Sequence, residues 1–342
     1  MYCIHMNILK KLIVTVATSI ALFVIVGFFL PQTAHVERAV LIDAPPATVF
    51  TVLNGFRQFN RWSPWADIDP NAVSTYEGPA SGVGSKMSWS GNAEVGSGSQ
   101  EILESTPYSG IRLRLTFGDF GGDFIASYAL TPEGSGTKVT WGFDADYGGS
   151  IVGRYFGLMS DSMLGPDYEK GLARLKEFAE SLPKADFSGL TFETTTSPAE
   201  PLVLLAVRSA NDANAIGVAL GVAYSRLSGF VTAQGLRQAG PPVAIYYGES
   251  GGTLSMDAAL PVDRTDVPLA EPIRTGRTFD GAVVKAVHYG DYTGLPAARE
   301  QLRAYLATAG LEQGGPMWEQ YVSDPGSTPV AELITNLFVP IK

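Results

Sequence analysis

The hydrophobic residues near the N-terminus form one unbroken run rather than a periodic pattern. Residues 12–30 contain no charged side chain, and Lys10 and Lys11 come directly before them. A helix of this length extends roughly 28 Å, close to the hydrocarbon thickness of a bilayer. Its apolar residues fall on every face, which excludes an amphipathic surface helix. The pattern therefore predicts one N-terminal transmembrane helix over 12–30.

The charges that flank this run predict its orientation. Lysines precede it, whereas the nearest basic residue after it is Arg38. By the positive-inside rule, a short cytoplasmic tail, 1–11, stays inside, and 35–342 lies on the periplasmic or extracytoplasmic side of the inner (cytoplasmic) membrane. A cleaved signal peptide is the alternative. Its apolar core is usually about 7–15 residues, and Gln32 stands in the candidate cleavage site where a small residue is preferred, so we favour the uncleaved anchor.

The next part of the chain alternates apolar and polar residues with period two and then changes to a helical period. Glycine, proline, serine and aspartate clusters separate the predicted strands. The elements expected are a short helix over 45–53 and strands over 36–42, 86–91, 100–105, 111–117, 124–131 and 138–145. A long amphipathic helix ending at Leu182 closes this domain, 35–182, ahead of a linker over 183–189. The order predicts a curved antiparallel sheet that one long C-terminal helix partly covers, leaving a cavity.

The last part, 190–342, contains an internal repeat. Each half has a strand, a helical stretch and two further strands, and the halves close on similar segments, 259–262 and 338–341. The strands expected are 202–208, 241–247 and 253–262 in the first half, and 283–289, 315–322 and 333–341 in the second. Neither unit is large enough for its own core, so the two should pair through a pseudo-two-fold axis. The fold class is therefore α+β.

Three segments of the first domain carry a family resemblance. They are Ala44-Pro45-Pro46-Ala47-Thr48-Val49-Phe50, Phe59-Asn60-Arg61-Trp62-Ser63-Pro64-Trp65 and the segment 165–176. With these motifs, residues 35–182 resemble the SRPBCC (START-like, polyketide cyclase-like) family. The resemblance implies a helix-grip fold around an apolar ligand cavity.

The second domain resembles another family. The segments 287–292 and 318–325 and the closing Val339-Pro340-Ile341 are similar in order and spacing to the GyrI-like small-molecule-binding domain, over about 190–342. That family includes the effector-binding domains of some transcription activators. The resemblance implies a ligand pocket in this half of the chain.

Composition narrows the classes of function. The net charge is −10, from 24 Lys and Arg against 34 Asp and Glu, so no basic patch for nucleic acid is expected. Cys3 is the only cysteine and allows no intramolecular disulfide. The three histidines, His5, His35 and His288, have no metal-ligand spacing. We expect no metal, no cofactor and no catalytic residue of the serine-hydrolase type.

Aromatic residues supply the candidate ligand contacts of the first domain. The candidates are Trp62, Trp65, Trp89 and Trp141. For any one of them, filling the core is the favoured interpretation. In a fold built around a cavity, however, some of such a set are expected to line an apolar pocket.

In the second domain, strand parity places Met317, Glu319 and Tyr321 on one face and Trp318 on the other. A glutamate between apolar neighbours is either solvated at an edge or a buried carboxylate that needs a partner. The ligand-binding candidates are Tyr246, Tyr247, Trp318, Glu319, Tyr321, Asn336 and Phe338. The GyrI-like resemblance implies a glutamate two residues before the closing aromatic. Asn336 stands there instead, which weakens cation selectivity and glutamate-based hydrolysis.

These observations favour a membrane-anchored protein that binds a small hydrophobic or amphipathic molecule without covalent chemistry. The alternative is a hydrolase or cyclase that acts on an apolar or strained small molecule using pocket carboxylates, with Glu319 as general base. A third hypothesis is a structural or sensory partner of another membrane protein. Direct control of transcription is disfavoured because the chain has no basic DNA-binding module.

Overall fold

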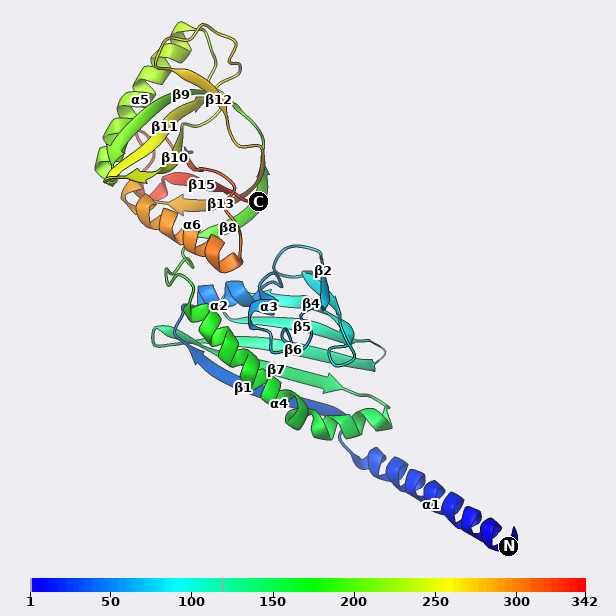
Figure 1. Cartoon of the computed structure of the whole chain (residues 1–342). Helices are drawn as coiled ribbons and strands as arrows, with labels where there is room; N and C mark the ends of the chain where they lie inside the picture. The colour runs from blue at the N-terminus through cyan, green and yellow to red at the C-terminus, as the bar shows by residue number, and fades with distance from the viewer. Residues whose placement is uncertain (1, 119) are drawn as a thin grey trace. The chain divides into compact units, whose positions relative to one another are not determined.

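The computed structural model describes residues 2–118 and 120–342, which divide into two compact units on either side of the step from Lys184 to Ala185 (Figure 1). This boundary lies within the linker expected from the sequence. Residue 1 of the expected cytoplasmic tail lies outside the described residues. Both units combine an antiparallel sheet with helices, so the α+β prediction is confirmed.

The first helix, α1, runs over Tyr2–Phe29 and includes the apolar run. Its window Lys10–Phe29 has a mean hydropathy of 2.6, and only 6% of it is buried, so it is long and apolar enough to cross a membrane or to serve as a signal sequence. Pro31, which cannot continue a helix, follows its end. A second helix, Ala213–Ala233, also has sufficient length and hydropathy, but it packs on a sheet along one side.

The sheet of the first unit has the order β1-β7-β6-β5-β4-β3-β2, with antiparallel neighbours throughout. Its strands are β1 Thr33–Ile42, β2 Val73–Glu77, β3 Lys86–Ser90, β4 Ser97–Thr106, β5 Gly110–Phe117, β6 Phe120–Glu133 and β7 Gly136–Asp146. The helices are α2 Pro46–Leu53, α3 Phe59–Trp62 and α4 Ile151–Glu180. Strand β2 was not expected from the sequence.

Helix α4 begins well before the amphipathic pattern that predicted it. Ser150 caps its N-terminus, where the Ser150 hydroxyl accepts a hydrogen bond from the Gly153 N–H at 3.0 Å. From Tyr168 onward, apolar side chains at helical spacing pack on the sheet, and Leu175 is fully buried there. In the earlier turns, several large apolar side chains between Val152 and Met163 are exposed. The amphipathic pattern in the sequence therefore predicts only the second half of α4, whose apolar side chains face the core.

The sheet of the second unit has the order β12-β9-β11-β10-β14-β15-β13-β8. Its strands are β8 Thr191–Ser197, β9 Pro201–Ala210, β10 Val243–Ser250, β11 Thr253–Pro261, β12 Arg274–Arg277, β13 Gly281–Tyr289, β14 Met317–Tyr321 and β15 Ile334–Pro340. The helices are α5 Ala213–Ala233 and α6 Leu295–Ala309, with short 3₁₀ turns η1 Tyr292–Gly294 and η2 Val330–Glu332.

The repeat expected from the sequence organises this sheet. The units β9-α5-β10-β11 and β13-α6-β14-β15 follow the same order, and they join where β10 pairs with β14. Both helices pack on one face, α5 over β9 and β11 and α6 over β13 and β15. A separate apolar cluster on the other face includes Leu204, Val283 and Trp318. The two halves therefore share a continuous sheet, and the space between the two helices lies over its middle.

Candidate functional site

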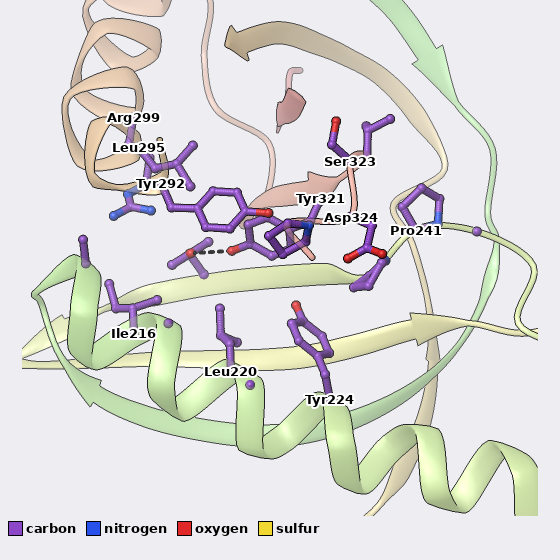
Figure 2. A pocket seen from close by; sticks show the side chains of 18 of the residues that line it. Ile216, Leu220, Tyr224, Pro241, Tyr292, Leu295, Arg299, Tyr321, Ser323 and Asp324 are labelled. Carbon is purple, nitrogen blue, oxygen red and sulfur yellow. Dashed lines mark hydrogen bonds between the residues drawn. The ribbon is translucent and has the colours of Figure 1, made fainter. Parts of the chain in front are cut away.

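A cavity of about 560 Å³ lies in the second unit, between α5 and the turn from η1 into α6 (Figure 2). Most of its wall is apolar or aromatic, and prolines close part of it. The lining residues are Ala213, Ile216, Gly217, Leu220, Gly221, Tyr224, Gln238, Gly240, Pro241, Pro242, Tyr246, Tyr292, Leu295, Pro296, Arg299, Tyr321, Val322, Ser323, Asp324 and Pro325. Its volume suits a small organic molecule.

The first half of α5 forms one wall because of its residue spacing. Asp212 caps the helix by accepting hydrogen bonds from the Asn214 and Ala215 N–H groups at 3.0 and 2.9 Å. Ile216 and Leu220 then lie on successive turns and point toward the cavity (Figure 2). Gly217 and Gly221 also line it, and a Cβ at either position would meet no atom within 4 Å. These glycines leave the wall beside α5 open.

A buried ion pair and two tyrosines lie at the floor of this cavity. The Arg299 guanidinium of α6 donates to Glu319 Oε1 at 2.7 Å. The hydroxyls of Tyr246 and Tyr321 donate to Glu319 Oε2 at 2.7 and 2.8 Å. The guanidinium also lies over the Tyr246 ring, 4.8 Å from its centroid. Both carboxylate oxygens are therefore engaged by neighbouring side chains.

Burial makes this network energetically sensitive. The side chain of Glu319 is 0% exposed and that of Arg299 is 8% exposed, so each charge depends on the other for compensation. Burial alone would lower the pKa of Arg299, but the Glu319 carboxylate raises it above its usual value. Burial, followed by the Glu319 charge, raises the pKa of Tyr246 and of Tyr321 well above 10. Arg299 therefore stays charged and the two phenols stay protonated near neutral pH.

A second cavity of about 600 Å³ adjoins the first, and the two share Tyr246, Pro296 and Arg299. Its lining is more polar and includes Asn211, Glu249, Glu300, Arg303 and Gln313. The shared arginine lies between an apolar space and a polar one. Such an arrangement suits an amphipathic guest whose polar end reaches the second cavity.

The structure separates the second-domain candidates by sheet face. Tyr246 and Tyr321 line the cavity, and Glu319 lies beneath them. Trp318 and Phe338 stack on the opposite face, with ring centroids 5.0 Å apart. Trp318 and Phe338 therefore do not contribute to the cavity that Tyr246 and Tyr321 line.

The remaining two candidates of this domain lie elsewhere. On β15, the Asn336 amide donates to the Gln320 side-chain oxygen at 3.1 Å. Tyr247 borders the second cavity, and its hydroxyl donates to Asp257, a carboxylate that also accepts from Arg274. Burial, with the Asp257 hydrogen bond, raises the pKa of Tyr247 to about 12.

The tryptophans of the first unit divide into core and periphery. Trp62 and Trp141 are each 2% exposed and pack edge to face, 5.6 Å between ring centroids. Trp141 also stacks on Tyr168 at 3.9 Å. Trp65 and Trp89 are half-buried, and the Trp65 Nε1–H donates to Asp167 at 3.0 Å. Trp62 and Trp141 therefore belong to the packed core of this unit.

Sequence reasoning missed Arg299, Tyr224 and Tyr292. A signal for Arg299 existed, because it lies within the apolar spacing of α6 between Leu295 and Leu302, where an unpaired charge is not expected. No sequence signal pointed to Tyr224 or Tyr292, because the cavity wall that they form depends on how α5 and η1 approach each other. Within residues 2–118 and 120–342, no group of three or more His, Cys, Asp or Glu side chains is placed to hold a metal ion.

Comparisons with known proteins bear on both units. Residues 33–180 match the family model described as polyketide cyclase / dehydrase and lipid transport, and residues 191–342 match the GyrI-like small molecule binding domain. Both resemblances drawn from the sequence are thereby confirmed. Both are families of small-molecule-binding domains. A sequence comparison with curated proteins gave no match.

Several solved structures are similar to part of the chain. Protein CV1439 from Chromobacterium violaceum is 21% identical over 44% of this chain and 99% of its own, with a TM-score of 0.31. The EcmrR C-terminal domain is 15% identical over 45% and 98%, with a TM-score of 0.39. A hydrolase encoded by lin2189 from Listeria innocua is 16% identical over 44% and 92%, with a TM-score of 0.32.

Proposed function

We propose that this chain, which joins a polyketide cyclase/dehydrase and lipid transport domain to a GyrI-like small-molecule-binding domain, is a membrane-anchored binding protein for a small hydrophobic or amphipathic molecule. The observation that carries the proposal is the cavity of about 560 Å³ walled by apolar and aromatic side chains in the second unit. Cavities of this size and lining commonly hold small organic ligands.

The polar groups of the cavity favour a guest without a net positive charge. The Glu319 carboxylate is already paired with Arg299 and accepts from two tyrosines. The Asp324 carboxylate, which lines the cavity, accepts from the Gly326 N–H at 2.9 Å and from the Ser327 hydroxyl at 3.3 Å. The Tyr224 hydroxyl likewise donates to the backbone carbonyl of Val243 at 2.8 Å. The aromatic rings and the aliphatic wall remain for contact. A neutral molecule with a planar apolar body fits this lining best.

The same geometry argues against Glu319 as the general base of the hydrolase or cyclase alternative. A general base needs a carboxylate oxygen within hydrogen-bond reach of the proton it removes. Both oxygens of Glu319 are occupied by Arg299 and tyrosine donors, and Glu319 lies beneath the lining rather than in it. We therefore propose binding without turnover.

Two glycines of α5 allow a controlled test of the cavity. Gly221 lines it and Gly229 does not, while a Cβ at either position would meet no atom within 4 Å. Both substitutions remove a helical glycine, so Gly221→Trp and Gly229→Trp should alter helix stability alike. Only the first places an indole in the cavity mouth.

The measurement is a thermal-shift screen of the full chain against neutral polycyclic aromatics, lipids and cationic dyes. We expect neutral compounds to raise the Tm of the wild type and of Gly229→Trp, with the shift lost in Gly221→Trp. Shifts that survive in Gly221→Trp would place the ligand elsewhere. A larger shift with cationic dyes than with neutral compounds would contradict the proposed ligand class.

The anchor rests on α1, whose apolar window has the length and hydropathy of a membrane span. We propose that it stays uncleaved, with both units on the extracytoplasmic side. Alkaline carbonate extraction of membranes, followed by N-terminal sequencing, tests this. Retention in the membrane pellet with the N-terminal segment present is expected. Release into the supernatant, or a mature N-terminus after Leu30, would show a cleaved signal instead.

A further inference from the structure

The first half of α4 exposes a row of apolar side chains, which we call the α4 stripe: Val152, Phe156, Met159 and Met163. Their spacing of four, three and four residues places them on one side of the helix. They are between 41% and 55% exposed. Single exposed apolar residues are ordinary, but a continuous row marks a surface that contacts something apolar.

The charges near the stripe are already engaged. Between residues 151 and 164 only Arg154 and Asp161 are charged. Asp161 accepts from the Arg38 guanidinium at 2.9 Å. Arg154 is 6% exposed and points away from the stripe toward α1. The face of α4 that carries the stripe is therefore apolar and has no unpaired charged side chain that would have to remain hydrated.

The end of α1 lies against the start of α4. The Arg154 guanidinium donates to the carbonyls of Gly27 and Phe28 at 3.3 and 2.9 Å, which supplies partners for carbonyls that a helix end leaves unpaired. The Tyr155 ring stacks on Phe23 at 4.2 Å between centroids, and its hydroxyl donates to the Phe23 carbonyl at 2.9 Å. The contact is close, because a Cβ on Gly27 would lie 2.4 Å from Ile151.

These contacts hold the first turn of α4, where the α4 stripe begins, beside the end of α1. Phe23 and Phe28 both belong to the apolar window Lys10–Phe29. If α1 spans a bilayer, the first turn of α4 sits beside its last two turns, at the depth where tyrosines concentrate in membrane proteins. Phe156 and Met159 lie on the next turns of the same helix, so they follow close to this boundary.

We propose that the α4 stripe is a membrane-contact surface that inserts its apolar side chains into the outer-leaflet interface of the bilayer that α1 spans. This inference rests on the anchor of the proposed function and adds a second attachment. The partner is lipid, because the row continues from the end of the apolar window and carries no free charge. Burial of such a row contributes through apolar area, so the contact should be insensitive to salt.

The test uses the full chain in phosphatidylcholine–phosphatidylethanolamine vesicles, with Cys3→Ser removing the native thiol. An environment-sensitive fluorophore is attached at Met159→Cys. The control is Glu177→Cys, an exposed position on the same helix beyond Pro166. We expect a blue shift and quenching by spin labels on the lipid acyl chains at position 159, unchanged in high salt, and neither at position 177.

The outcomes separate the contact from the anchor. If the chain floats with the vesicles but position 159 responds as position 177 does, the contact is wrong and the anchor stands. If the chain does not float, both are wrong. A blue shift at position 159 that grows with protein density and resists lipid quenching indicates a second copy of the chain and overturns the lipid assignment. In Phe156→Ser, the quenching at position 159 should fall while flotation persists.

Discussion

The two units use aromatic and charged side chains in opposite ways. In the first, Trp62, Trp141 and Tyr168 are buried, and Trp141 contacts the other two rings. Its ion pairs, such as that of His35 with Asp144, stay at the surface. In the second unit, tyrosines surround a cavity, and the pair of Arg299 with Glu319 is buried beneath it.

This difference has a physical reason. The tryptophans of the first unit pack edge to face against other rings, and the buried Nε1–H groups of Trp62 and Trp141 have no hydrogen-bond partner among the described residues. A buried phenol needs an acceptor, and Tyr246 and Tyr321 find the same carboxylate oxygen. Holding their hydroxyls at the sheet orients the rings toward one side. In this chain, the tyrosines that share a buried acceptor line a cavity, whereas the stacked Trp141 and Tyr168 lie in the core of the first unit.

Removing a ring from the cluster of Trp62, Trp141 and Tyr168 should have the largest effect on stability. Trp141→Ala removes the ring that contacts both Trp62 and Tyr168, which should lower the free energy of unfolding of the first unit by about 3–5 kcal/mol. Urea unfolding followed by near-ultraviolet circular dichroism measures it. Trp65→Ala, at a half-buried position, is the control and should cost less. Equal losses of stability in Trp141→Ala and Trp65→Ala would show that the core does not depend on the contacts of Trp141 with Trp62 and Tyr168.

Breaking the buried ion pair should come next. Arg299→Met leaves Glu319 buried without its cation, although two tyrosine donors remain, so we expect a loss of about 3 kcal/mol in the second unit. Arg299→Met/Glu319→Gln removes the stranded charge and should recover most of it. Denaturant unfolding of both variants checks this. A double variant as unstable as the single one would mean that the ion pair itself, not the stranded charge, sets the cost.

The buried phenols make the second unit sensitive to alkali. Burial raises the pKa of Tyr224 well above 10, so its contribution to stability is complete below about pH 10 and is lost as the pH rises toward the folded-state pKa. Tyr224→Phe should remove about 1.4 kcal/mol per pH unit of that loss. Chemical unfolding at several pH values between 9 and about 11 gives the slope. An unchanged slope would show that Tyr224 ionises freely in the folded state.

The exposed pair of the first unit should have the smallest effect. The Asp144 hydrogen bond raises the pKa of His35, so the pair stabilises most below about pH 6.5 and loses its effect as the pH rises through the folded-state pKa. Both side chains are more than half exposed, so solvent screens the pair and His35→Ala should change stability by less than about 0.5 kcal/mol at any pH. Thermal unfolding at two pH values measures this. A larger, pH-dependent loss of stability in His35→Ala would show that the pair contributes substantially to folding.

Much of the fold followed from the sequence. Period-two alternation predicted most strands, and helical spacing predicted the part of α4 that faces the core. Its first turns were missed because their apolar row, from Val152 to Met163, faces outward rather than toward the sheet. The edge strands β8 and β12 were also missed. They are placed by pairing with β13 and β9, which no local pattern encodes.

By itself, the sequence determined the order of the elements, the repeat in the second half and the apolar N-terminal run, because each depends on the spacing of residues near one another in the chain. Only the tertiary structure decided which faces meet. Strand parity put Glu319 and Trp318 on opposite sides, but the packing of α6 on β14 brought Arg299 to the carboxylate, and the approach of α5 to η1 left the cavity above it. Cavities and buried ion pairs depend on contacts between distant segments, and those contacts form only when the sheet and its helices assemble.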